Sequence, residues 1–187
     1  MKTLLVILCG WSVAAALAAD VYQPDPDHTF AWFEFNHAGY SLQRDRFDKV
    51  NASVSLDLQN QTGSVEASVD VNSINTGSSR FNQVLLSDAF FDVARFPVMT
   101  FKSSRFSFDR LDNVTAVEGD LTIKGITRPV TLSVTHYKCM MHPMLHRLVC
   151  GLNATARVSR SDFNLGKYVP LVSNDITLYV SIEAIQQ

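Results

Sequence analysis

Residues 50–71 read VNASVSLDLQNQTGSVEASVDV, and this stretch decides the fold class. Apolar side chains occupy alternate positions on both sides of a turn-forming segment at residues 60–63. A period of two gives a strand one apolar face and one polar face. The same alternation returns four times, over residues 119–123, 130–134, 152–158 and 176–182. Antiparallel strands that each bury one face curl around a shared interior, so the sequence predicts an all-β fold with a closed antiparallel barrel.

The alternation also places the strands along the chain. We expect an opening strand over residues 29–37, a long strand from about 47 to 58, and a third over 64–71. A hairpin centred on Gly125 joins two strands, and the last strand covers residues 175–184.

One segment departs from the period of two. Phe81, Val84 and Leu85 are spaced by three and one, and Ala89 follows four positions later, which is typical of a short helix. Ser78 or Ser79 can cap its first turn. We therefore expect one short helix between early strands, covering one mouth of the barrel.

The N-terminus is typical of a secretory signal peptide. Lys2 is the only charge before Asp20, an apolar run begins at Leu4, and residues 16–18 read Ala-Leu-Ala. This pattern predicts cleavage after Ala18 and export of the remainder. Residues 1–18 are then the signal peptide, and residues 19–187 form one domain.

Charge and motifs exclude several function classes. The chain has 16 basic and 18 acidic residues and no basic run, so a nucleic-acid partner is not expected. It contains no Gly-x-Ser-x-Gly or His-Glu-x-x-His motif, and no pair of carboxylates falls on the inward-facing set. We therefore predict a protein that is not an enzyme and has no cofactor.

Two cysteines remain after the signal peptide, and they allow two interpretations. Cys139 and Cys150 flank a short polar loop, and in an oxidising compartment such a pair forms a disulfide. Together with His142 and His146 they also present the ligand types of a zinc or copper site. We favour the disulfide, with no metal, over this four-residue alternative.

Motifs along nearly the whole exported chain resemble those of the YceI-like family. They are Tyr22-x-x-Asp25, His28-Thr29, Phe33, His37-x-Gly39, Ser73-Ile74-x-Thr76-Gly77, Arg80, Leu85, Ser87-Asp88-x-Phe90-Phe91-Asp92, Phe96-Pro97-x-Met99-x-Phe101-x-Ser103, the run 119–130, and Arg160-Ser161-Asp162-Phe163. The resemblance implies a lipocalin-like barrel of eight antiparallel strands with one helix, exported mostly to the periplasm, although an extracellular location is compatible with the signal peptide. It also implies a bound isoprenoid, such as a polyprenyl phosphate or a ubiquinone-type quinone, and no catalytic activity.

Two positions depart from the family pattern. Many relatives carry an acid after the arginine that corresponds to Arg80 and a histidine before the helix leucine, where this chain has Phe81 and Val84. The mouth is therefore more apolar than in those relatives. A quinone ring fits such a mouth better than a charged pyrophosphate.

The inward-facing set mixes large and small side chains, which is compatible with a narrow channel and also with a fully packed core. The resemblance favours the channel. The predicted ligand-binding residues of the barrel interior are Phe33, Phe35, Val54, Val69, Phe81, Leu85, Phe91, Met99, Phe101, Leu121, Val134, Ala156 and Leu178.

The candidates for binding the lipid head group are His37, Arg80 and Asp162, and each has an alternative structural role as a satisfied histidine, a cap or an ion pair. The expected function is to hold a prenyl chain for transport, storage or sequestration, with transient membrane or membrane-protein contact for exchange. The alternative is a ligand-free secreted interaction or stress-response protein with a packed barrel. The sequence is compatible with a monomer and with a homodimer.

Overall fold

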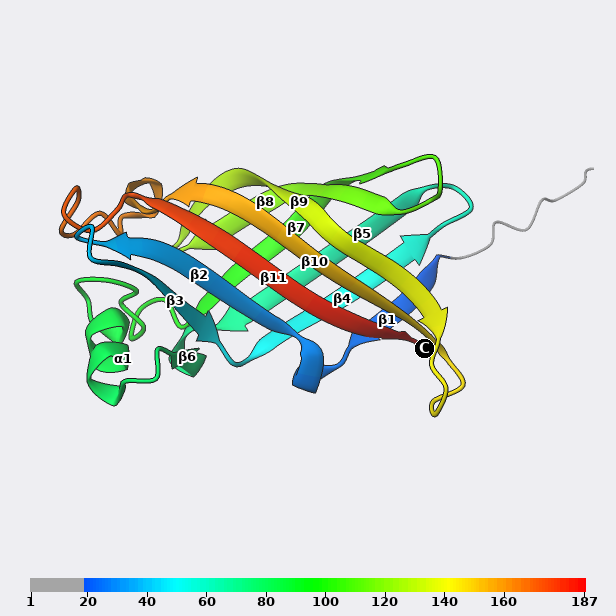
Figure 1. Ribbon diagram of the computed structural model, residues 1–187, viewed down its shortest axis with the longest axis horizontal. Coiled ribbons are helices and arrows are strands. Elements are labelled where there is room, and N and C mark those ends of the chain that lie inside the picture. The colour runs from blue at the N-terminus through cyan, green and yellow to red at the C-terminus, as the bar shows by residue number, and fades with distance from the viewer. Residues whose placement is uncertain (1–18) are drawn as a thin grey trace, which may run out of the picture.

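Eight antiparallel strands close into a barrel in the computed structural model, which describes residues 19–187 (Figure 1). In order around the ring they are β1 (Asp20–Pro24), β4 (Val50–Asp57), β5 (Thr62–Asp70), β7 (Val98–Phe108), β8 (Val114–Ile123), β9 (Ile126–Met141), β10 (Leu148–Ser159) and β11 (Asp175–Gln186). The ring closes because β11 pairs with β1, with Tyr22 opposite Gln186. The predicted all-β, eight-stranded barrel is confirmed, and the predicted signal peptide lies outside the described residues.

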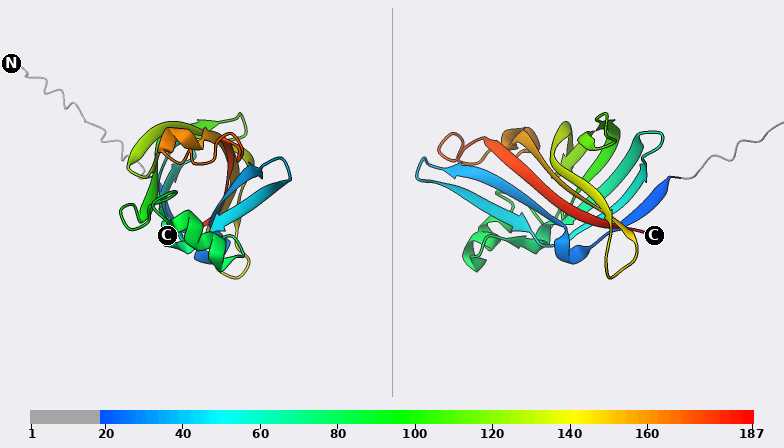
Figure 2. Two further views of the ribbon diagram at one scale, coloured as in Figure 1. Left: turned by 90° about the vertical axis from the view of Figure 1, so that its left-hand side faces the viewer. Right: turned by 45° about the vertical axis from the view of Figure 1, so that its right-hand side comes forward.

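Three further strands extend the sheet beyond the ring. They are β2 (Phe30–His37), β3 (Ser41–Phe47) and β6 (Ile74–Asn75). The C-terminal part of β11 pairs with β1, whereas residues 177–181 of β11 pair with β2 along the same edge. A short 3-10 turn, η1 (Pro26–His28), separates β1 from β2. Figure 2 shows the β2–β3 hairpin leaning outward from the ring at one end.

The strand prediction was wrong in two places. The long strand predicted from about 47 to 58 begins at Val50, and residues up to Phe47 belong to β3, which runs the other way along β2. β1, β3 and the two-residue strand β6 were not predicted. β3 reads SLQRDRF, with polar residues on both faces, so it carries no apolar alternation that would reveal it.

The helix lies where the spacing of apolar residues predicted it. α1 covers Ser79–Leu86, and the Ser78 hydroxyl accepts a hydrogen bond from the Phe81 amide at 3.3 Å. Leu85 is buried on its inner face. In Figure 2, α1 lies across part of the barrel end that also carries the tip of the β2–β3 hairpin. Two more 3-10 turns, η2 (Val71–Ser73) and η3 (Arg160–Phe163), end strands at this same end. Within residues 19–187, no helix is both long enough and apolar enough to cross a bilayer.

Two apolar clusters lie toward opposite ends of the barrel. The cluster at the α1 end joins Phe47, Val71, Leu85, Phe91 and Phe163, which come from the hairpin, the helix and the turns. The cluster at the other end consists of Tyr22, Val54, Leu56, Cys150 and Ala184. The space that the side chains of these two clusters leave inside the barrel decides what it can hold.

Candidate functional site

A cavity of about 400 Å³ occupies the barrel interior. Its wall is made by the inward-facing members of the alternating strands and by the inner side of α1. Most of the residues predicted from the sequence line it, namely Phe33, Phe35, Val54, Val69, Phe81, Leu85, Phe91, Met99, Phe101, Leu121 and Leu178. The barrel is hollow, so of the two packing alternatives the structure has the channel.

Two predicted interior residues, Val134 and Ala156, are not part of the cavity wall. Ala156 is buried, but Leu178 stands opposite it in register, and this longer side chain forms the wall there. Val134 pairs with Ala154 at the β-bulge where the β9–β10 register shifts. A bulge changes the direction of nearby side chains. The prediction for Val134 assumed unbroken alternation along β9 and therefore did not allow for the bulge.

The cavity is closed at one end and open at the other. At the end away from α1, the lining residues Tyr22, Leu56, Val114 and Cys150 are all buried. At the α1 end, by contrast, His37, Val84, Lys167 and Tyr168 line the cavity and are exposed to solvent. We call this opening the mouth.

Aromatic rings hold the helix and the loop after it against the hairpin at the mouth. The ring centres of Phe33, Phe47 and Phe91 lie 5.6 to 6.3 Å apart. Phe35 of β2 and Phe81 of α1 are 6.4 Å apart. Such pairs add to the free energy gained by burial alone. The mouth is thus a fixed and strongly apolar opening.

Of the three predicted head-group residues, only His37 borders the cavity. It lies at the end of β2, where its backbone forms an isolated bridge with Val172. Arg80 and Asp162 are exposed and do not line the cavity. Arg80 directly precedes Phe81 in the sequence, and Asp162 directly precedes Phe163. Both phenylalanines line the cavity, and adjacent side chains point to different sides of the backbone.

Sequence reasoning missed Arg160, although it noted the motif that contains it. This arginine is buried and lines the cavity. Its guanidinium group donates hydrogen bonds to the backbone carbonyls of residues 165, 167, 172 and 173; the bonds to Lys167, Val172 and Ser173 measure 2.8 to 2.9 Å. Burial lowers the pKa of the Arg160 side chain. Four of its five N–H groups hold the loop of residues 164–174, so the main role of this side chain is structural. The acceptors are backbone carbonyls, which no sequence motif marks.

Several residues that line the cavity carry hydroxyl groups, and these were also not predicted. Thr29 is buried, and its Oγ1 has no hydrogen-bond partner within residues 19–187. Tyr22 and Tyr137 stand at the closed end, where burial raises the pKa of both phenols. The charged groups of the cavity wall, Arg160 and Lys167, lie toward the mouth, and Thr29, Tyr22 and Tyr137 add neutral hydroxyl groups.

Asp45 is a further buried group outside the cavity wall. It lies on β3 opposite Phe33, is 5% exposed, and its Oδ2 has no hydrogen-bond partner within the described chain. Desolvation raises the pKa of this carboxyl group to about 6. Its charge at neutral pH therefore opposes the packing of the β2–β3 hairpin.

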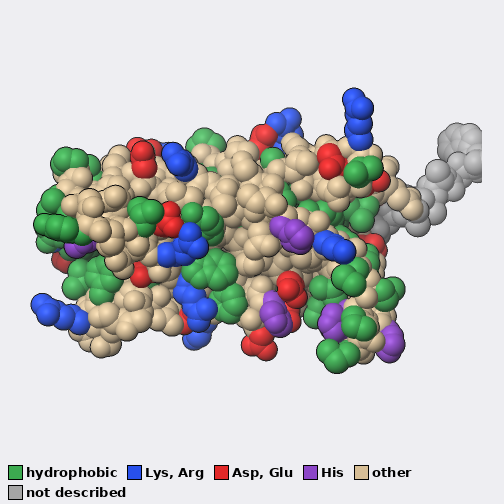
Figure 3. Space-filling view, in the orientation of Figure 1, with side chains coloured by type: hydrophobic (Ala, Val, Ile, Leu, Met, Phe, Trp, Pro, Cys, Tyr) green, Lys and Arg blue, Asp and Glu red, His purple; other side chains and the backbone are tan. Residues whose placement is uncertain are grey.

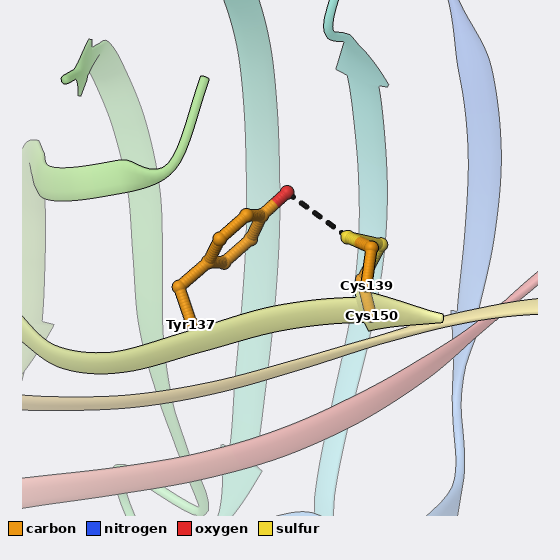
Figure 4. The surroundings of a disulfide bond; sticks show 3 residues. All are labelled: Tyr137, Cys139 and Cys150. Carbon is orange, nitrogen blue, oxygen red and sulfur yellow. Dashed lines mark hydrogen bonds between the residues drawn. A yellow bond between two sulfur atoms is a disulfide. The ribbon is translucent and has the colours of Figure 1, made fainter. Parts of the chain in front are cut away.

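The predicted disulfide between Cys139 and Cys150 is present. The two residues are opposite one another in the β9–β10 register, with Cα atoms 4.0 Å apart. The Tyr137 hydroxyl donates a hydrogen bond to Cys139 Sγ at 3.1 Å (Figure 4). Because the two sulfurs are bonded to one another, neither is a free thiolate that could bind a metal ion together with His142 and His146. No group of three or more His, Cys, Asp or Glu residues within 19–187 is placed to hold a metal ion.

Comparison with known proteins identifies the family. The sequence matches the model of the YceI-like domain over residues 22–184. The chain belongs to the YceI-like family. Among its relatives, the UPF0312 protein Ent638_1570 of Enterobacter sp. (strain 638) is 31% identical over 192 aligned positions, which cover 100% of this chain and 98% of that protein.

Solved structures of low sequence identity share the fold of this YceI-like chain. BcnA of Burkholderia cenocepacia aligns with a TM-score of 0.72 at 22% identity, over 86% of this chain and 98% of that one. A polyisoprenoid-binding domain from Saccharophagus degradans, implicated in plant cell wall breakdown, aligns with a TM-score of 0.65 at 16% identity, over 91% and 100% of the two chains.

Proposed function

We propose that this YceI-like protein is an exported, non-catalytic carrier that holds the prenyl chain of an isoprenoid lipid inside the barrel. The observation that carries the proposal is the apolar cavity, closed at one end and open beside α1. Its shape suits a slender hydrocarbon that enters at the mouth and ends near Tyr22. The name of the polyisoprenoid-binding structural neighbour supports the same ligand class for this chain. The signal sequence and the family resemblance support a periplasmic location.

Burial of the tail supplies the affinity. Each methylene removed from water contributes about 0.8 kcal/mol before the cost of ordering the chain is subtracted. Larger ligands return less free energy per atom, so added length increases the affinity progressively less. The carrier therefore favours a minimum tail length that fills the cavity and discriminates weakly among longer tails that protrude from the mouth.

The mouth favours a neutral head group of the quinone type over a phosphate. A pyrophosphate needs several cationic or N–H donors converging on it. Here four of the five Arg160 N–H groups bind backbone carbonyls, and Arg80 is outside the cavity wall. Among the described residues, Lys167 is the one lysine of the lining. A quinone ring needs mainly flat apolar surfaces, which Phe81 and Phe90 provide, with His37 as a hydrogen-bonding partner at the edge.

Organic extraction of the purified mature protein followed by mass spectrometry tests the proposal. We expect a prenyl lipid at a substantial fraction of one molecule per barrel, with a quinone-type head. A prenyl phosphate would overturn the preference for the quinone. An extract without prenyl lipid, from protein that also fails to take one up from detergent, would overturn the carrier function and favour a ligand-free interaction protein.

A pair of neighbouring substitutions on β9 makes the test specific to the cavity. Leu132 lines the cavity, whereas Thr131 is exposed on the other face of the strand. We expect Leu132→Asp, like Phe33→Asp or Phe101→Asp, to abolish lipid co-purification, because an unpaired carboxylate in the channel is costly to desolvate. Thr131→Asp keeps the lipid. Far-UV circular dichroism identifies any variant that loses lipid only because it does not fold.

A further inference from the structure

Large apolar side chains are exposed at the two ends of the barrel, and one group surrounds the mouth. This group, which we call the mouth rim, consists of Tyr40, Leu42, Val84, Tyr168 and Leu171. The exposed fractions of Tyr40, Leu42 and Leu171 are 87%, 66% and 67%. Figure 3 shows hydrophobic side chains gathered at the left-hand end, which carries the mouth, and again over the β9–β10 hairpin at the lower right.

The elements of the mouth rim are joined to one another. The tip of the β2–β3 hairpin contacts the loop of residues 164–174, where the Ser173 amide donates to the Asn36 carbonyl at 3.0 Å. That loop contacts the segment after α1, where the rings of Tyr168 and Phe90 are 6.2 Å apart. The rim is therefore one continuous border around the cavity opening.

The fold holds these side chains in the solvent instead of allowing them to pack inward. Arg160 binds four backbone carbonyls of the loop, which fixes the segment that presents Tyr168 and Leu171. Tyr168 has a φ of 66°, a backbone conformation that costs free energy for a bulky side chain. The hairpin tip is a turn with positive φ at Ala38 and Gly39, which leaves Tyr40 exposed. When a fixed backbone holds several apolar side chains exposed to water, the surface they form indicates a binding site for a partner.

The chemistry of the rim favours a lipid bilayer over a protein. Tyrosine and long cationic side chains are the groups that settle at the boundary between hydrocarbon and lipid head groups. Lys167 lies 5.2 Å from the centre of the Tyr168 ring, and Arg80 is exposed on the adjacent helix. Within residues 19–187, neither cation takes part in an ion pair. Both are free to meet anionic phospholipid head groups.

We propose that the mouth rim docks transiently on the surface of a bilayer that contains anionic phospholipid, with the cavity opening facing the hydrocarbon. This inference rests on the proposed carrier function, since docking lets a prenyl lipid pass between bilayer and barrel without crossing water. The β9–β10 hairpin at the opposite end, although equally apolar, borders no opening and has no such role.

Vesicle flotation tests the docking with two matched triple variants. The rim variant carries Tyr40→Ser, Leu42→Ser and Leu171→Ser, three exposed residues that do not line the cavity. The control carries Met140→Ser, Met141→Ser and Met144→Ser on the β9–β10 hairpin, where the exposed fractions are 55%, 60% and 79%. The vesicles contain phosphatidylethanolamine with phosphatidylglycerol as the minor component. We expect the rim variant to lose about tenfold or more in vesicle binding, and the control to bind like the wild type.

Two results would overturn the proposal that the mouth rim docks on a bilayer. One is a wild-type protein that does not float with the vesicles, and the other is a rim variant that binds as well as the control does. Arg80→Gln is expected to weaken binding to these vesicles and not to vesicles of phosphatidylcholine alone. An equal effect on both would overturn the assignment of anionic phospholipid.

A second measurement separates docking from the carrier function. Uptake of a prenyl quinone from the vesicles should slow about tenfold in the rim variant, whereas its equilibrium loading from detergent should match that of the wild type. If the wild type itself takes up no prenyl quinone from detergent, the carrier function fails, and flotation alone then decides whether the mouth rim binds a bilayer.

Discussion

Arg160 is buried beside an apolar cavity, and it is stable there because backbone carbonyls replace the water that it loses. Four residues of the loop 164–174 supply these acceptors, so one side chain connects the end of β10 to the wall of the mouth. A charged donor contributes more free energy than a neutral one, and carbonyls left without it would be unsatisfied. The arginine is therefore a structural clamp for the mouth.

Replacing the clamp should destabilise the protein. An ammonium group cannot reach several diverging carbonyls as a planar guanidinium does. We expect Arg160→Lys to lower the free energy of unfolding by about 2–4 kcal/mol, measured by urea denaturation. Arg157→Lys, at an exposed position of β10 just before the turn that contains Arg160, serves as the control and should change little. Equal stability of the two variants would contradict the clamp.

Asp45 predicts how stability depends on pH. Desolvation raises the pKa of its carboxyl group to about 6, above the value of 3.8 for an unperturbed aspartate. The folded state thus binds the proton more tightly than the unfolded state does. This contribution to stability is complete below pH 3.8 and is lost as the pH rises through about 6.

Comparison with Asp45→Asn isolates this group. Between pH 4 and pH 7.5, the wild type should lose up to about 3 kcal/mol of unfolding free energy relative to the variant. Urea denaturation of both proteins across this range measures the difference. Parallel stability curves would show that Asp45 has an ordinary pKa.

At the scale of the elements, alternation predicted most strands because it is a property of the local backbone. The helix was likewise predicted by its apolar spacing and its serine cap. β3 was not predicted because its buried positions include Asp45, and a carboxylate does not indicate an inward-facing position in a sequence pattern. β1 was not predicted because it is short and ends just before the turn η1. Both misses lie where the ring of eight strands gives way to the hairpin.

The pairing of β7 with β8 depends on a glycine. A Cβ atom at Gly119 would lie 2.4 Å from the Lys102 carbonyl oxygen and 2.6 Å from Cζ of Phe101. The Phe101 ring therefore lies over Gly119 and uses the space that a side chain would need. We expect Gly119→Ala to lower stability by about 1–3 kcal/mol in thermal denaturation, since the backbone contact cannot relax easily.

Gly151 is the matched control for this prediction. It also stands within a strand, but a Cβ atom there would have no neighbour nearer than 3.9 Å. Gly151→Ala should therefore be tolerated. A protein that accepts both substitutions equally would contradict the close contact of Phe101 with β8.

For the molecule as a whole, the hollow interior sets which lipid can be held. Ala52, Ala67 and Phe101 stand side by side across β4, β5 and β7, and all three line the cavity. Ala52→Phe adds a ring to this row and shortens the channel without adding a charge. We expect lipid extracts of this variant to contain shorter tails, or less lipid, than those of the wild type.

Ser53→Phe, which places the same ring on the exposed face of β4, is the control. Mass spectrometry of the extracts compares the two variants. An unchanged distribution of tail lengths in Ala52→Phe would show that the tail does not pass this row.

The sequence by itself determined the class of the fold, the inward face of most strands, the helix and the cysteine pair. These depend on residues close together in the chain, where periodicity and spacing are visible. Only the tertiary structure decided that the interior is hollow, where its mouth lies, and that Arg160 supports the mouth while Arg80 and Asp162 face away. These depend on which distant segments become neighbours, such as β11 meeting both β1 and β2, or the Phe101 ring over Gly119. Alternation says which side chains point inward, but the volume they leave empty depends on how all the strands close together.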